Sequence, residues 1–415
     1  MDPSLLPVRP VSLWRNRDYM LLWSGQVVSV VGSSVSAIVV PLLILALTNS
    51  PAAAGIAGAL AAIPYVLFSL PAGALIDRWD RKKVMVLCDL GRSITFASIP
   101  FAMWFDVLTI WQLYVAAFVE GTLFVFFNIA EVAALPRVVP KEQLGDATAQ
   151  NMSTFGVAGM IGPGLGGFLF QSVGRAVPFV LDAFSYLASA LSLLLIKTSF
   201  QGERAPAERK LRAEIMEGLR WAWNEPLVRF TSFISGSMNL TWSASVLIII
   251  VLAKQWGEGE AAIGTIFSIG SVGGVIGAAL GGRINRRFSI GQIVVANTWA
   301  SALLFPLYAL APNIIVLGVI SAVLFTTGPI YGVAVLSYRL ALIPDALQGR
   351  VNSAVRLVAF GGIPLGSMLG GFLLEQIGAI NSIWVFSAFL LGLGILVLLK
   401  PVKEGNKTVG VEQAA

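Results

Sequence analysis

The chain has 415 residues, of which 56% are hydrophobic and only 12% are charged, and its formal net charge is +6. Soluble proteins average about 25% charged residues, so this composition excludes a soluble globular protein and indicates a membrane protein. Basic residues beside membrane spans explain the positive charge, so we expect no nucleic-acid partner.

Two scarce residue types limit the possible chemistry. The only cysteine is Cys88, which excludes an internal disulfide and a multi-cysteine metal site, and histidine is absent. We therefore expect neither a metal nor a cofactor. Proton exchange near neutral pH would have to use carboxyl groups.

Long apolar runs separated by Pro, Gly and charged clusters predict twelve membrane-spanning helices, each long enough to cross a bilayer. The runs are continuously apolar, whereas transmembrane strands alternate over about ten residues. The first residues are polar and broken by Pro, unlike a cleavable signal peptide. The predicted spans cover residues 17–47, 51–77, 82–105, 109–137, 143–172, 176–197, 227–254, 260–283, 287–310, 313–341, 346–377 and 380–400.

The basic residues predict the orientation of these spans. Of the 28 Lys and Arg residues, only Arg175 and Lys254 fall in loops predicted to lie outside. Such one-sidedness follows the positive-inside rule for an even number of spans. We expect a cell-membrane protein with both termini in the cytoplasm.

The stretch "GALIDRWDRKKV", residues 73–84, follows the second predicted span and has six charges between Asp77 and Lys83. Its basic residues can anchor a cytoplasmic turn, but carboxylates contribute little to orientation. The acids Asp77 and Asp80 therefore indicate specific ion pairs or contacts with a helix amino terminus.

An internal repeat predicts the architecture. The segment that starts at Pro140 aligns without gaps with the segment that starts at Pro344, and "GGFL" occurs at the same place in both. We therefore predict an all-α membrane protein of two pseudo-symmetric six-helix halves in parallel orientation, with the substrate site between them. The predicted parts are the halves 1–197 and 227–400, a linker 198–226 and a tail 401–415.

The linker is too polar to span a membrane. Within it, Leu211, Ile215, Leu219 and Trp223 recur every four positions, which predicts an amphipathic helix from near Pro206. We expect this helix to lie on the cytoplasmic membrane surface.

Several motifs resemble the major facilitator superfamily. "GALIDRWDRKK" is similar to its loop motif between helices 2 and 3, although Asp80 replaces the second Gly of that motif. "GPGLGG" resembles the helix-5 motif of its antiporters. "NRDYMLLWSGQVVSVVGSSV" and "FFNIAEVAALPRVVP" are similar to the drug-efflux branch that contains macrolide-efflux and enterobactin-export proteins. The residues that match the two motifs are Gly73, Asp77, Arg78, Arg81 and Lys82, and then Gly162, Pro163, Gly166 and Gly167.

The resemblance implies the twelve-helix fold of that superfamily and an export function. It also implies that Asp77, with Arg78 or Arg81 and Glu131, forms a conformational latch that holds the halves together in the outward-facing state. The glycines of the fifth span allow close helix packing, and Pro163 can kink that helix.

Charged residues inside the spans are candidates for proton coupling because burial in lipid is costly. Glu120 lies eleven residues inside its helix, about 16 Å deep and close to the midplane. It either exchanges protons during transport or forms a permanent ion pair with Arg92. Asp89 is three residues before Arg92 and can pair with it. We expect Asp182 to form hydrogen bonds between helices.

Aromatic and polar residues at suitable depths predict a cavity for amphipathic compounds. Arg356 either meets an anionic substrate there or caps the latch. The predicted cavity residues are Gln26, Tyr65, Phe124, Asn128, Asn239, Trp242, Tyr331, Arg356 and Phe360.

The sequence lacks a G-x-x-x-x-G-K-[ST] loop and clustered catalytic residues, so we expect neither an ATP-driven pump nor an enzyme. We favour a monomeric, proton-coupled antiporter that exports amphipathic small molecules or drugs, with a role in multidrug resistance. One alternative is an exporter of a single endogenous metabolite, such as a siderophore or a lipid. The other is a non-transporting membrane receptor.

Overall fold

The structure is a computed structural model that describes residues 12–201, 211–344 and 347–399. Pro206, where we expected the linker helix to begin, and the tail 401–415 lie outside these ranges. Within the described residues the chain is helical and contains no strand. The helices are α1 (Arg17–Thr48), α2 (Pro51–Ile76), α3 (Arg81–Trp104), α4 (Ile110–Val138), α5 (Leu144–Ser172), α6 (Val177–Leu195), α7 (Leu211–Asn224), α8 (Pro226–Gln255), α9 (Glu260–Arg287), α10 (Ile290–Leu304), α11 (Ile314–Leu342) and α12 (Gln348–Leu399), with short 3-10 helices η2 (Leu13–Arg15), η3 (Lys141–Gln143) and η4 (Phe305–Leu310).

Twelve membrane spans are present in this part of the chain. Eleven segments are long and apolar enough to cross a membrane. The last, within the 52-residue α12, contains two spans because Gly378 breaks the helical path with φ 78° and ψ 173°. Glycine adopts positive φ without the steric cost that other residues incur, so the chain can turn sharply there. The predicted fold class is confirmed.

The boundaries of the eighth and ninth predicted spans differ most from the structure. The helix α9 continues to Arg287, so Arg286 and Arg287 lie in its last turn, where the helix dipole favours cations. The ninth span begins as α10 and continues as the 3-10 helix η4 from Phe305. Pro306 lacks a backbone N–H, which explains why the α-helix does not continue there.

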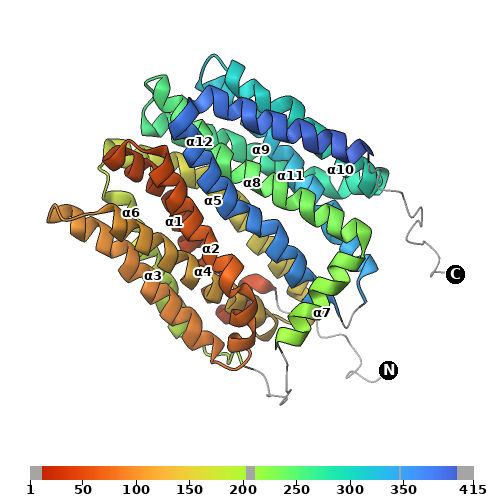
Figure 1. The fold of residues 1–415 in the computed structure, drawn as a ribbon. Coiled ribbons are helices and arrows are strands. Elements are labelled where there is room, and N and C mark those ends of the chain that lie inside the picture. The colour runs from red at the N-terminus through yellow and green to blue at the C-terminus, as the bar shows by residue number, and fades with distance from the viewer. Residues whose placement is uncertain (1–11, 202–210, 345–346, 400–415) are drawn as a thin grey trace, which may run out of the picture.

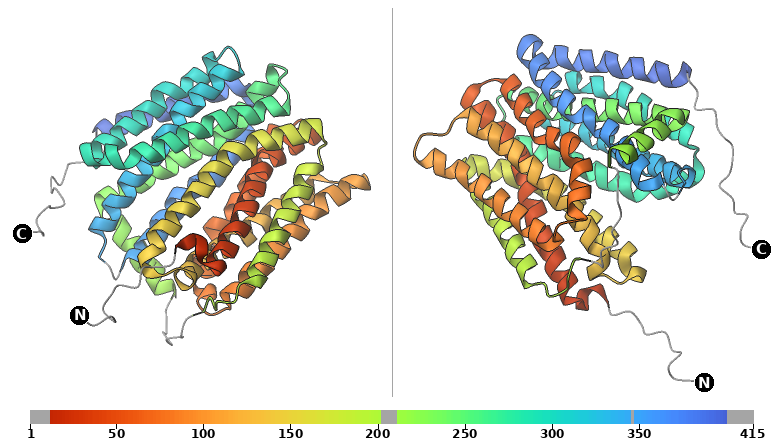
Figure 2. Two further views of the ribbon diagram at one scale, coloured as in Figure 1. Left: turned by 180° about the vertical axis from the view of Figure 1, so that it is seen from behind. Right: turned by 60° about the horizontal axis from the view of Figure 1, so that its bottom comes forward.

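The spans form two groups, α1–α6 and α8–α12 (Figures 1 and 2). We call the end of the bundle where α1 passes into α2 the far end. The opposite end, where the described chain begins and ends, is the terminal end. A continuous buried apolar cluster includes side chains of both groups, such as Val39 and Ile248.

Glycines of the repeat make equivalent contacts inside each half. The backbone of Gly162 in α5 lies against Ser34 of α1, and a Cβ atom there would overlap it. The equivalent Gly366 in α12 lies against Leu240 of α8 in the same way. Small residues allow such close approach of helices in membranes. The pseudo-symmetry of the two halves therefore extends to individual backbone contacts.

The next glycines of the repeat make the contacts between the halves. Gly167 of α5 lies against the backbone of Glu260 at the start of α9, and Gly371 of α12 lies against that of Pro51 at the start of α2. Figure 2 shows α5 at the boundary beside the second group. Two symmetric helix pairs, α5 with α9 and α2 with α12, join the halves.

Hydrogen bonds close the far end between the halves. The Gln171 side chain at the end of α5 accepts a bond of 2.8 Å from the Ala261 N–H of α9. Glu375 of α12 accepts from the Ala52 N–H of α2 at 3.0 Å and from the Ser50 hydroxyl. In the described part of the chain, the hydrogen bonds between the halves lie in the half of the bundle nearer the far end. The structure therefore has its far end closed.

The linker contains the expected helix, α7, at the terminal end. Its Gly218 packs on the backbone of Arg350 at the start of α12, and Glu217 forms an ion pair of 2.5 Å with Arg350. The linker helix is thus attached to the second half.

Candidate functional site

A single buried cation, Arg92 of α3, is the centre of a polar cluster in the first half. Its Nη2 atom lies 2.8 Å from the Glu120 carboxylate of α4, and its Nη1 atom lies 3.8 Å from Asp89. Nη2 also donates to the Tyr186 hydroxyl at 2.9 Å and to Ser33 Oγ at 3.3 Å. Side chains of α1, α3, α4 and α6 therefore converge on one guanidinium group.

The two carboxylates beside Arg92 differ in their surroundings. The Asp89 side chain is fully buried, whereas 22% of the Glu120 side chain is accessible. Asp89 lies one helical turn before Arg92, so the helix itself fixes their approach. Glu120 comes from a different helix. Glu120 is therefore the partly accessible carboxylate of this cluster.

Carboxyl groups outnumber cations in the interior of this half. Asp89, Glu131 and Asp182 are buried, and Arg92 is the buried cation of the described residues. Buried charges without partners are costly, so excess carboxyl groups are retained where they bind protons or accept hydrogen bonds.

Asp182 has a structural environment. It accepts hydrogen bonds from the Ser36 hydroxyl of α1 and, at 3.0 Å, from Ser185 of its own helix. The bond with Ser36 joins α6 to α1, as expected from the sequence.

Glu131, a residue of the predicted latch, is buried rather than exposed. It is buried on α4, accepts a long hydrogen bond of 3.5 Å from Asn151 of α5, and has Gln26 beside it. Gln26, a predicted cavity residue, therefore belongs to the interior of the first half.

The charged turn between α2 and α3 is built from local contacts. Asp80 caps α3 by accepting a hydrogen bond of 3.1 Å from the Lys83 N–H, which explains the acid where the superfamily motif has Gly. Arg81 lies 3.7 Å from Asp77 and donates to the carbonyl oxygens of Ala133 and Phe200 at 2.8 and 3.2 Å. With the far end closed, Arg81 thus holds together elements of its own half.

The remaining motif residues have distinct surroundings. Gly73 has open space where a side chain would be, whereas Gly162 and Gly166 pack on α1 and Gly167 packs on α9. Pro163 lies inside α5, and its carbonyl meets Gly264 of α9. The helix-5 motif therefore contacts both its own half and the opposite half.

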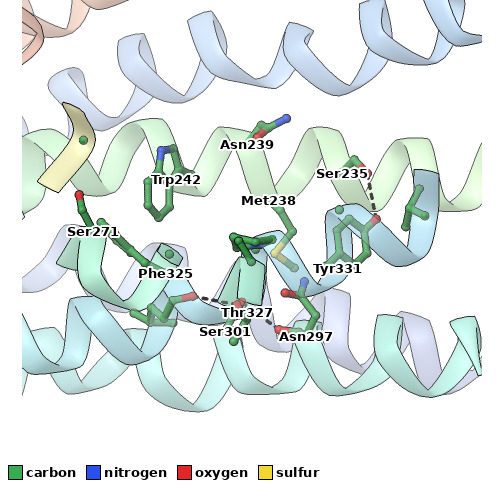
Figure 3. Close-up of a pocket in the computed structure, with 18 of the residues that line it drawn as sticks. Ser235, Met238, Asn239, Trp242, Ser271, Asn297, Ser301, Phe325, Thr327 and Tyr331 are labelled. Carbon is green, nitrogen blue, oxygen red and sulfur yellow. Dashed lines mark hydrogen bonds between the residues drawn. The ribbon is translucent and has the colours of Figure 1, made fainter. Parts of the chain in front are cut away.

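A cavity of about 1500 Å³ is lined by α5 and by the helices of the second half (Figure 3). The aromatic rings of Trp242 and Phe325 meet there with centroids 4.0 Å apart. The Tyr331 hydroxyl donates to the Thr231 carbonyl at 3.0 Å and bonds with Ser235. Five of the predicted cavity residues line it, namely Asn239, Trp242, Tyr331, Arg356 and Phe360.

One lining residue is turned away from the other labelled side chains. Figure 3 shows Asn239 pointing away from them, and its amide donates a hydrogen bond of 2.8 Å to the Ala359 carbonyl of α12. Asn239 therefore joins α8 to α12 at the edge of the cavity.

The other predicted cavity residues lie in the first half and do not line this cavity. Tyr65 packs on Phe360 across the boundary, with centroids 4.9 Å apart. Phe124 lies beside the polar cluster around Arg92, with its ring centroid 5.6 Å from the guanidinium carbon. Asn128 is partly buried on α4.

Sequence reasoning missed several residues that complete these sites. Tyr186 and Ser33 around Arg92 have no charge to identify them. Arg339, which lines the cavity, is in the last turn of α11, where a basic residue is interpreted as an orientation signal. Gln171 and Glu375 could have been found, because both occupy the same position after "GGFL" in the repeat.

The comparisons with known proteins agree with this architecture. Residues 9–413 match the family described as transmembrane secretion effectors. Enterobactin exporters EntS of Shigella boydii serotype 18 and Escherichia coli O81 are each 26% identical over 402 residues, which cover 96% of this chain and 94% of theirs.

Solved transporters have the same fold. The nucleoside transporter NupG has a TM-score of 0.74 at 13% identity, with 93% of this chain and 98% of that chain covered. A bacterial homologue of the iron transporter ferroportin in an inward-facing state has a TM-score of 0.72 at 16% identity, with 94% and 99% covered.

Proposed function

Because the chain belongs to the transmembrane secretion effector family of the major facilitator superfamily, we propose that it exports amphipathic small molecules in exchange for protons. It is a multi-pass membrane transporter rather than an enzyme or a receptor. The observation that carries the proposed coupling is the contact of Arg92 with Glu120, a partly accessible carboxylate inside the membrane-spanning bundle.

The proposed cycle uses the two sites separately. Substrate enters the cavity between α5 and the second half from the terminal end while the far end is closed. A proton that binds Glu120 removes the charge that attracts Arg92, so the packing of α3 against α4 can change. Loss of that proton restores the pair. The bundle thereby alternates between a state open at the terminal end and a state open at the far end. A proton can drive this change only because it binds the two states with different affinity.

The proposed orientation places the terminal end, and with it both termini, in the cytoplasm of a cell-membrane protein. Arg283, Arg286 and Arg287 on the last turns of α9 support this placement. The functional parts are the halves 1–197 and 227–400, the linker 198–226 and the tail 401–415. One chain supplies both the Arg92 cluster and the whole described lining of the cavity, so we propose a monomer.

A second candidate is an exporter of one endogenous metabolite, such as a siderophore. The relatives described as enterobactin exporters favour it, since they match nearly the whole chain. The two candidates differ in the number of compounds that the protein moves.

The test is uptake of a compound panel into inverted membrane vesicles that contain the protein. We expect several amphipathic compounds to accumulate when the vesicle interior is acidic, and accumulation to stop when an ionophore removes the proton gradient. Uptake of one compound alone would select the metabolite exporter. If no compound responds to the gradient, the coupling proposal is wrong.

The proposed latch predicts the effect of Asp77→Asn. The variant should insert normally but favour the state that is open at the terminal end, because the latch forms only when that end closes. Loss of one partner of a partly buried pair shifts such an equilibrium by about tenfold. The measurement is the labelling rate of Ser153→Cys, which lines the cavity, in a Cys88→Ser background.

Asp80→Asn is the matched control, because it removes the same charge three residues away while Asn still caps α3. We expect its labelling rate and transport to equal those of the parent protein. If Asp77→Asn also leaves both unchanged, the charged stretch is only an anchored turn.

A further inference from the structure

We propose that the cavity selects anionic substrates and that Arg339 and Arg356 are the cations that bind them. This inference rests on the proposed export function, whose substrate class it defines. It concerns molecules that combine an acidic group with an aromatic or apolar body.

The charge of the cavity wall is the first argument. Arg339 in the last turn of α11 and Arg356 in α12 both line the cavity, and every other described lining residue is uncharged. An acidic residue in the wall would favour cations, and the described lining contains none. Charged groups of one sign in a cleft with low-dielectric walls concentrate ions of the opposite sign.

The second argument is that these two arginines have no carboxylate partner in the described part of the chain. Arg81, Arg92 and Arg350 each form an ion pair there. Arg339 and Arg356 form none, and the buried Nε atom of Arg339 has no hydrogen-bond partner. A buried guanidinium donor without an acceptor is costly, and an anion from outside the protein would satisfy it.

The third argument is that the two cations line one cavity from different helices, Arg339 from α11 and Arg356 from α12. Like charges repel each other, and the described lining contains no acidic residue that would offset their repulsion. An anion bound between them would be attracted by both. The guanidinium groups therefore form an incomplete site that a carboxylate, sulfonate or phosphate group completes.

The rest of the cavity fits the body of such a molecule. Tyr331 lies eight residues before Arg339 on α11, which is about 12 Å along the helix. Beyond it, the rings of Trp242 and Phe325 offer an aromatic surface (Figure 3). The acidic group would thus lie toward the terminal end and the aromatic body deeper inside.

The same end of the second half attracts anions before they bind. Arg283, Arg286 and Arg287 of α9 are exposed there. On α5 the nearest acid, Asp146, is six residues before Met152, the first lining residue of that helix, which places it about 9 Å outside the wall. The exposed arginines of α9 thus add positive charge at the entrance.

The test compares two fluorescent probes with the same rings, the anion 8-anilino-1-naphthalenesulfonate and the neutral N-phenyl-1-naphthylamine. Binding is titrated against the full chain in lipid nanodiscs, with empty nanodiscs as the blank. We expect the sulfonate to bind about tenfold more tightly than the neutral probe, as a charged hydrogen bond predicts. Arg339→Gln with Arg356→Gln should remove this preference and leave the affinity for the neutral probe within about twofold.

Arg350→Gln is the matched control, because it removes an arginine of α12 that pairs with Glu217 and does not line the cavity. It should keep the preference for the sulfonate. Arg339→Lys with Arg356→Lys should keep part of it, since charge remains without the guanidinium geometry. Neutral-probe binding in every variant reports that the cavity is folded.

The proposal would be overturned by equal affinity of the parent protein for both probes, by equal loss in Arg350→Gln, or by tighter binding of a third, cationic probe, ethidium, than of the sulfonate. Gradient-driven uptake of the neutral probe with no anion preference would overturn anion selection and leave the export function standing. Selective sulfonate binding without gradient-driven uptake of any probe would support anion selection and overturn the export function.

Discussion

Glu120→Gln is expected to reduce proton-driven transport to the level of empty vesicles while the protein still folds. Glutamine keeps the size of the side chain and can accept a hydrogen bond from Arg92, which lies 2.8 Å from Glu120. It cannot take up or release a proton, so the proposed exchange at this residue would stop. Gradient-driven uptake in proteoliposomes is the measurement.

Asp182→Asn is the control for this prediction. Asp182 is also a carboxyl group in the first half, but it accepts hydrogen bonds from the Ser36 hydroxyl at Oδ2 and from Ser185 at Oδ1. The amide oxygen of Asn can keep the bond from Ser36, and Ser185 keeps its hydrogen bond of 2.7 Å to the backbone carbonyl of residue 182. We expect Asp182→Asn to retain gradient-driven uptake. If Glu120→Gln keeps full pH-dependent transport, its contact with Arg92 is a permanent structural ion pair.

Arg92→Gln is expected to cause the largest loss of stability, about 3 to 5 kcal/mol, because it leaves buried carboxylates without their cation. Arg92 is 3% exposed and contacts Asp89, Glu120, Tyr186 and Ser33. The measurement is unfolding in detergent followed by tryptophan fluorescence. Arg350→Gln is the comparison, since its ion pair is partly exposed and should contribute only about 0 to 1 kcal/mol.

A double variant separates the charge effect from lost packing. Adding Glu120→Gln to Arg92→Gln removes one of the uncompensated carboxylates, so part of the stability should return. If Arg92→Gln unfolds at the same denaturant concentration as the parent protein, the cluster does not stabilise the fold. If the double variant regains no stability, the loss comes from Asp89 and from the packing around Tyr186.

The sequence predicted the number of spans well because a lipid-facing segment must be apolar and helical along its whole length. The repeat also predicted the division into two halves, since its two "GGFL" segments need close backbone contacts at equivalent places. The turn at Gly378 was also anticipated, because the predicted spans 346–377 and 380–400 lie on either side of it. The change from α-helix to the 3-10 helix η4 near Pro306 was not predicted, because it depends on how that segment packs.

The sites were predicted unevenly, for a physical reason. Arg92, Asp89 and Glu120 could be grouped because a charge inside a membrane needs a partner. The direction in which an uncharged side chain points could not be predicted in the same way. A membrane helix is apolar on all sides, so the depth of a residue does not show which side of the helix it occupies. Phe124 and Trp242 have suitable depths, yet Phe124 lies beside Arg92 and Trp242 lines the cavity.

The two crossing contacts at the far end differ in charge although they are equivalent by position. Gln171 and Glu375 stand at the same position of the repeated segment, and each satisfies a backbone N–H in the first turn of a helix from the other half. A hydrogen bond to a carboxylate is roughly twice as strong as one to a neutral amide. One closure of this end is therefore charged and the other is neutral, so the two helix pairs need not separate together.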